Sequence, residues 1–279
     1  MHDTIPGLPD GRSKCSLAQT AFAAIQKWFD AYTSQFRLPD AKYQHFITLK
    51  IEHTHHVRRE IRELAESVKL DTGAKRVVEA VALLHDVGRF AQYRRYRTFS
   101  DLGSEDHGEL GKRTILEHGV LSAIDEHTRN LILHAVSSHN KMRPIPHPQP
   151  EFRLFASLLR DADKLDILRI VAAHYENRDA AEEGDLGLGL SGAPEISAAV
   201  LQSFLSGRMV RLEQVTTLDD LKILQIGWIY DLNFPLTLRK IEQRNYLDRI
   251  LQTLPQTEAT AQICRKLAEL LAEGTPSTD

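Results

Sequence analysis

The stretch Val81-Ala-Leu-Leu-His-Asp-Val-Gly-Arg-Phe90 places an imidazole beside a carboxylate at the end of an apolar helical segment, which Gly88 closes. A charged carboxylate buried in such a segment is strongly unfavourable unless it is paired or coordinates a cation. His and Asp are both common ligands of divalent metal ions. We therefore expect His85 and Asp86 to bind a metal ion. The alternative is an ion pair at the helix end.

Four other segments carry residue types that could complete such a site. Each has a histidine or an aspartate in or beside an amphipathic helical pattern. They are Lys50-Ile-Glu-His-Thr-His-His-Val57, Asp106-His-Gly-Glu-Leu-Gly111, Ile132-Leu-His-Ala-Val-Ser-Ser-His139 and Leu159-Arg-Asp-Ala-Asp-Lys-Leu-Asp166.

In this order the segments resemble the HD-domain superfamily of metal-dependent phosphohydrolases. The resemblance covers roughly residues 45–170 and lies in the patterns HTxxV, HDxGRF, DHxxxG and DADKLD. A lone His-Asp pair would be weak evidence, whereas four motifs in the family's order are specific. The resemblance implies an all-α fold, an HD-domain helical bundle with additional C-terminal helices.

The resemblance also implies a set of six metal ligands. A first ion would take His53, His85, Asp86 and Asp163, and a second ion would share Asp86 and add His107 and His139. Composition alone leaves three alternatives open, which are His56 for His53, His134 for His139 and Asp161 for Asp163. The family's motif positions favour the first-named set and leave Asp161 as a candidate hydrogen-bond partner of a ligand imidazole.

Neutral imidazoles together with carboxylates suit Mn, Fe, Co, Ni, Zn or Mg, so we expect one or two divalent ions of this group as the cofactor. Cys15 and Cys264 lie outside the ligand segments and form no metal or redox motif. We therefore expect a metal-activated water to act as the nucleophile.

The implied activity is hydrolysis of a small phosphorylated substrate, a phosphomonoester or a phosphodiester, with nucleotides among the candidates. Asp86 would be the central catalytic carboxylate, and Arg89 and Lys164 would supply positive charge to the phosphate. The alternative is a mixed-valent diiron oxygenase of the same superfamily that cleaves a C–C or C–P bond. The ligand residues alone do not separate these two activities.

The whole chain has the composition of a globular protein. It has 279 residues, of which 42% are hydrophobic, and a net charge of only -3. This charge gives no argument for a nucleic-acid-binding surface, and no apolar run is long enough for a membrane span. Two widely separated cysteines favour a reduced, cytoplasmic protein. A homo-oligomer is possible, and the sequence does not decide the oligomeric state.

Helical periodicity runs through most of the chain. We expect helices at 17–36, 41–69, 74–88, 107–118, 123–140, 151–178, 194–206, 216–245 and 256–273, one strand candidate at 209–215, and a loop or lid at 177–194. The expected organisation is a disordered leader at 1–14, an HD-type helical metal-binding domain at 15–215, and C-terminal helices at 216–279 that pack on the same domain.

Overall fold

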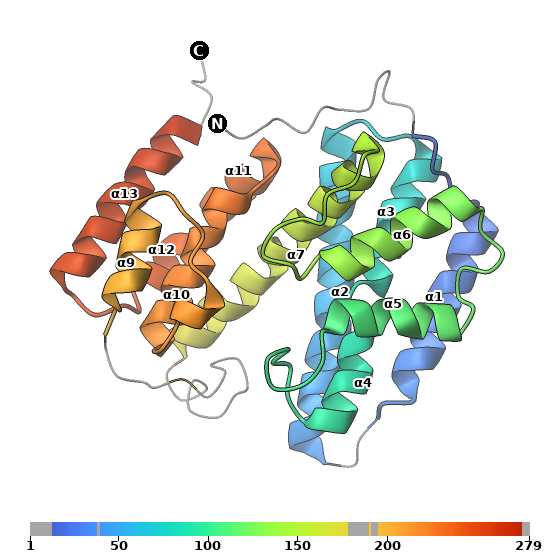
Figure 1. The fold of residues 1–279 in the computed structure, drawn as a ribbon, viewed down its shortest axis with the longest axis horizontal. Helices are drawn as coiled ribbons and strands as arrows, with labels where there is room; N and C mark the ends of the chain where they lie inside the picture. Colours follow the sequence, from blue (N-terminus) through green and yellow to red (C-terminus); the bar gives the residue numbers. More distant parts are fainter. Residues whose placement is uncertain (1–12, 38–39, 178–189, 191–194, 275–279) are drawn as a thin grey trace. The chain divides into compact units, whose positions relative to one another are not determined.

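The fold is entirely helical in the part of the chain that the structure describes. The computed structural model describes residues 13–37, 40–177, 190 and 195–274. Within these ranges it contains helices and no β-strand, as Figure 1 shows, so the all-α prediction is confirmed. Most of the predicted leader and of the predicted loop at 177–194 lies outside the described residues.

The chain divides into two compact units, Met1–Asp166 and Ile167–Asp279. The predicted domain limits at 15–215 and 216–279 stay a prediction, because a division into compact units does not by itself define domains. None of the described helices has the length and apolar character that crossing a membrane requires.

The first unit holds the segments that carry the predicted ligands. Its helices are α1 (Gln19–Ser34), α2 (Ala41–Ser67), α3 (Thr72–Leu84), α4 (Val87–Tyr96), α5 (His107–Glu117), α6 (Glu126–Ser138) and the first part of α7 (Pro150–Glu176), drawn from blue to yellow-green in Figure 1. Helix α3 packs against α1, α2 and α6, while α5 packs against α4 and α6. Eight of the thirteen α3 residues are buried, as expected of a helix that is apolar on most of its faces.

The break between α3 and α4 falls at the His-Asp pair. The predicted helix at 74–88 is wrong at this end, because α3 stops at Leu84 and α4 starts at Val87. Asp86 between them has φ -104° and ψ 14°, outside the helical region. A Cβ on Gly88 would lie 2.3 Å from the carbonyl oxygen of His107, so only glycine allows α4 and α5 to approach this closely. The break and the glycine bring Asp86 and His107 together.

The second unit begins within α7. It continues with α9 (Ala198–Leu205), η3 (Leu212–Gln214), α10 (Leu218–Ile226), η4 (Gly227–Asp231), α11 (Pro235–Gln243), α12 (Tyr246–Leu251) and α13 (Glu258–Gly274). The strand predicted at 209–215 is wrong, since this segment contains the 3-10 helix η3. The single helix predicted at 216–245 is also wrong. Its pattern is divided among α10, η4 and α11, which starts with a proline in its first turn.

Candidate metal centre

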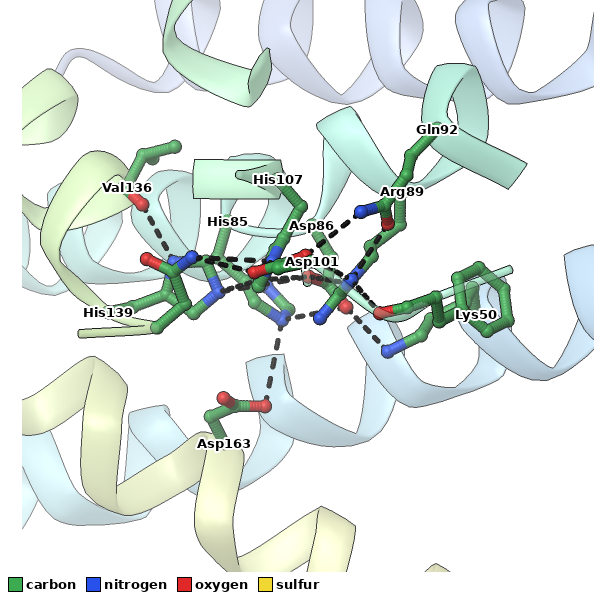
Figure 2. Close-up of polar contacts among 12 residues, drawn as sticks. Lys50, His85, Asp86, Arg89, Gln92, Asp101, His107, Val136, His139 and Asp163 are labelled. Carbon is green, nitrogen blue, oxygen red and sulfur yellow. Dashed lines mark hydrogen bonds and ion pairs between the residues drawn. The ribbon is translucent and has the colours of Figure 1, made fainter. Parts of the chain in front are cut away.

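The six predicted ligands converge at one place inside the first unit. His53 lies on α2, His85 and Asp86 lie between α3 and α4, His107 opens α5, His139 follows α6, and Asp163 lies on α7. The first five are buried, with at most 5% of each residue exposed, and the side chain of Asp163 is 15% exposed. Figure 2 shows five of these side chains, those of His85, Asp86, His107, His139 and Asp163, gathered around the Asp86 carboxylate.

One oxygen of Asp86 faces a first pair of imidazoles. Its Oδ2 atom lies 3.6 Å from Nε2 of His53 and 3.5 Å from Nε2 of His85. The two Nε2 atoms are 3.3 Å apart. Asp163 closes this group, because its Oδ1 atom lies 3.1 Å from Nε2 of His53 and 3.8 Å from Nε2 of His85. Two imidazoles and two carboxylates therefore surround one point.

The other oxygen of Asp86 faces a second pair of imidazoles. Its Oδ1 atom lies 3.5 Å from Nε2 of His107 and 3.7 Å from Nε2 of His139. These two Nε2 atoms are 3.0 Å apart. Asp86 is therefore shared by two groups of donors, one on each of its oxygens.

The far nitrogen of each imidazole is held by an acceptor. The Nδ1 atoms lie 2.7 Å from Oδ2 of Asp166 (His53), the carbonyl of Ala82 (His85), Oδ2 of Asp101 (His107) and the carbonyl of Val136 (His139). A carbonyl or a carboxylate oxygen only accepts, so Nδ1 carries the proton in each ring. In the neutral tautomer all four Nε2 atoms then present lone pairs to the centre.

This arrangement fits a cation. Two unprotonated nitrogens as close as Nε2 of His107 and His139 cannot form a hydrogen bond with one another, and their lone pairs repel unless a cation lies between them. Burial lowers the pKa of His85 to about 4 and that of His107 to about 3, so both rings are neutral near pH 7. The donors that converge here are nitrogen and oxygen, the set preferred by the divalent ions named above.

The imidazole of His53 is the exception when no metal is bound. Burial and the nearby Lys50 both lower its pKa, but hydrogen bonds with Asp163 and Asp166 outweigh them, and the pKa is raised above 6.5. The carboxylate-rich group around His53 is therefore the one that attracts positive charge most strongly.

Arg89 lies beside the centre, where neighbouring side chains engage its guanidinium. Its Nη1 atom donates to Oδ1 of Asp101 at 2.8 Å and to Oε1 of Gln92 at 2.7 Å, and its Nε atom lies 3.7 Å from Oδ1 of Asp86 (Figure 2). Asp101 in turn holds His107. The guanidinium therefore supports a ligand, and its contact with substrate stays a prediction.

Lys164 follows Asp163 on α7, and its side chain is buried. The predicted contact of this ammonium with a phosphate stays a prediction. Of the alternative ligands, the side chain of His56 is 33% exposed and its Nδ1 atom lies 3.3 Å from Asp166, the carboxylate that also holds Nδ1 of His53. His134 packs on the rings of His147 and Phe152.

Three residues at the centre were not predicted from the sequence, and only Asp166 among them lies in a quoted motif, DADKLD. The Nζ atom of Lys50 donates to Oδ2 of Asp86 at 2.8 Å and lies over the ring of Phe99. Asp101 and Asp166 hold ligand imidazoles. Lys50 stands three residues before His53 and Asp166 three residues after Asp163, the spacing that shares a helix face, so this spacing was the available signal.

The comparison with known families comes from one match. The sequence model of the HD domain matches residues 51–168, a range that holds all six converging ligands. This part of the chain is an HD domain. No curated protein and no solved structure matches the chain. The matched range starts one residue after Lys50, so it leaves this lysine out, and it includes Asp166 near its end.

Proposed function

We propose that this HD-domain protein is a metal-dependent phosphohydrolase that cleaves a phosphomonoester or a phosphodiester, with nucleotides among the candidates. The observation that carries the proposal is the position of Asp86, whose two oxygens face two separate pairs of imidazoles. This geometry suits two cations that share one carboxylate. HD domains form a superfamily of the metal-dependent phosphohydrolase type.

The proposed ligands divide into two groups around Asp86. On the distances between donor atoms, His53, His85 and Asp163 would hold one ion and His107 and His139 the other, with Asp86 common to both. Bound divalent ions supply a water with a pKa lowered toward neutrality and positive charge for phosphoryl oxygens. The protein keeps the four imidazoles in the tautomer that such binding needs, through their Nδ1 hydrogen bonds.

Lys50 is the side chain that we assign to the substrate. Its ammonium has three N–H donors and uses one of them on Asp86, which leaves donors for an anionic oxygen beside the centre. The lysine is 17% exposed, so it is accessible without being fully solvated. Arg89 then acts indirectly, because it orients Asp101 and through it His107.

The test is metal reconstitution. The protein is stripped with a chelator, loaded separately with Mn, Co, Ni, Zn, Mg or Fe, and assayed on aryl phosphate monoesters, aryl phosphate diesters and a nucleotide panel. We expect metal-dependent release of the alcohol or of phosphate without oxygen consumption.

The variants and their control decide the outcome. His85→Ala should lose bound metal and activity together, whereas His134→Ala, which changes a histidine outside the centre, should keep both. Inactivity of every metal form on the whole panel would overturn the proposal. Oxygen uptake by the iron form would favour the diiron oxygenase.

A further inference from the structure

A second cluster of metal-ligating side chains lies outside the six-ligand centre. It consists of Cys15, His127 and Glu151, whose donor atoms all lie within 4.8 Å of one another. Cys15 precedes α1, His127 is the second residue of α6, and Glu151 is the second residue of α7. Three segments that are distant in the sequence thus meet at this cluster.

The cluster is buried on two sides and open on one. Cys15 is fully buried, Glu151 is 5% exposed, and the side chain of His127 is 32% exposed. Oε2 of Glu151 lies 3.0 Å from Nε2 of His127, and Oε1 accepts from the backbone N–H of Cys15 at 3.1 Å and from the hydroxyl of Ser13. These hydrogen bonds explain the buried carboxylate, but none of them requires a thiol at position 15.

The donor types point to a particular ion. Thiolate sulfur, imidazole nitrogen and carboxylate oxygen are the three ligand types of protein zinc sites. Zinc-to-ligand distances of about 2.0–2.3 Å place ligand atoms roughly 3.3–3.8 Å apart in a tetrahedron, a spacing that fits within the span of this cluster.

A buried hydroxyl supports the same assignment. Thr128 follows His127 and is fully buried, and its hydroxyl interacts with the Cys15 thiol and lowers the pKa of that thiol. It stands beside the sulfur, as expected of a group that stabilises a thiolate ligand.

A catalytic Cys-His pair is the competing interpretation of the cluster. Burial and the charge of Glu151 raise the pKa of the Cys15 thiol to about 12, although the Thr128 hydroxyl acts in the opposite direction. A thiol with such a pKa is not a nucleophile near pH 7. The cluster is therefore not arranged for covalent catalysis.

We propose that Cys15, His127 and Glu151 bind one zinc ion, with the fourth coordination position taken by water on the exposed side of His127. Binding replaces the S–H bond by a sulfur–zinc bond and releases one proton to solvent. The ion would tie the segment before α1 to the first turns of α6 and α7. Nothing in this assignment depends on the activity of the HD centre.

Cobalt substitution tests the site because only a cysteine ligand gives an intense sulfur-to-cobalt charge-transfer band in the near ultraviolet. The six ligands of the centre include no sulfur, so their cobalt form lacks this band. We expect the full-length chain to develop the band on titration with Co2+, to saturate it at the intensity of one thiolate-bound ion per chain after the centre has filled, and to lose it on addition of Zn2+.

Matched variants complete the test. Cys15→Ser should lose the band, whereas Cys264→Ser, which changes the exposed cysteine, and His85→Ala should keep it. His127→Gln alters a partly exposed residue and should weaken cobalt affinity at least about tenfold while circular dichroism stays unchanged. A cobalt-loaded protein without the band, or a band that Cys264→Ser removes, would overturn the proposal.

Discussion

The six-ligand centre and the Cys15 cluster both combine histidine with a carboxylate, but they differ in how the imidazole nitrogens are hydrogen-bonded. At the centre each Nδ1 atom is engaged by an acceptor, and the Nε2 lone pairs of His107 and His139 face one another with no proton to share. At the cluster, Nε2 of His127 lies within hydrogen-bond distance of Glu151, and a cation must displace that hydrogen bond. The centre is therefore preorganised for a cation, whereas the cluster has a satisfied form without one. We expect the centre to bind metal more tightly.

Removal of the shared carboxylate should have the largest effect on the centre and none on the Cys15 cluster. Asp86→Ala takes a ligand from both imidazole pairs, so we expect metal affinity at the centre and phosphatase activity to fall by roughly a hundredfold or more, beyond the effect typical of outer partners. The cobalt–thiolate band of the cluster should persist in this variant. Full activity of Asp86→Ala would contradict the assignment of the centre.

The second-largest effect is expected when a carboxylate that holds a ligand imidazole is changed. Asp101→Asn weakens the support of His107, and Asp166→Asn weakens that of His53. We expect each change to lower affinity for one ion by about 10- to 100-fold and to leave the other ion bound. Isothermal titration with Mn2+ measures this difference. Equal loss of both ions in both variants would show that the two halves of the centre do not act separately.

Lys50 should affect substrate more than metal. We expect Lys50→Met to raise KM or to lower kcat/KM by about tenfold, the size of one lost charge-assisted hydrogen bond. Lys50→Arg, which keeps the charge, should retain more of the activity. If Lys50→Met instead released the metal and left kcat/KM per bound metal unchanged, the lysine would only support Asp86.

The pH dependence of stability should show the smallest effect. Without metal, the pKa values of His85 and His107 are lowered in the folded chain. Just below pH 6.5 these two imidazoles are therefore protonated only in the unfolded chain. Their contribution to stability is complete above pH 6.5 and is lost as the pH falls toward about 4. The raised pKa of His53 acts in the opposite sense and offsets part of this loss.

We expect the net loss between pH 7 and pH 5 to be about 2 kcal/mol in the free energy of unfolding. Urea denaturation of the metal-free chain at the two pH values measures it. Greater stability at pH 5 would mean that protonation of His53 outweighs the two buried neutral rings.

The ligands of the centre were accessible to sequence analysis because they sit in motifs, four of them at helix ends and two, His53 and Asp163, inside α2 and α7. His85, Asp86, His107 and His139 each lie at a helix boundary, where the local sequence carries a signal. The all-α fold followed from periodicity in the same way. The end of α3 could not be predicted from periodicity, because the helical sequence pattern continues through Asp86 while the backbone at Asp86 is not helical.

The partners of the ligands and the second cluster depend on contacts between distant segments. Asp101 reaches His107 from a loop, and Arg89, predicted to touch phosphate, is engaged with Asp101. Cys15 makes no motif with its neighbours in the sequence. Its relation to His127 and Glu151 arises only because the segment before α1 passes the first turns of α6 and α7.

The central claim is that Asp86 joins two metal ions. Electron paramagnetic resonance of the Mn2+-loaded Cys15→Ser chain tests it directly, since this variant removes the sulfur ligand of the second cluster. We predict two Mn2+ per chain and a spin-coupled spectrum, which Asp86→Ala converts to the weak binding of isolated ions. A single Mn2+ per chain with the six-line signal of an isolated ion would contradict the account.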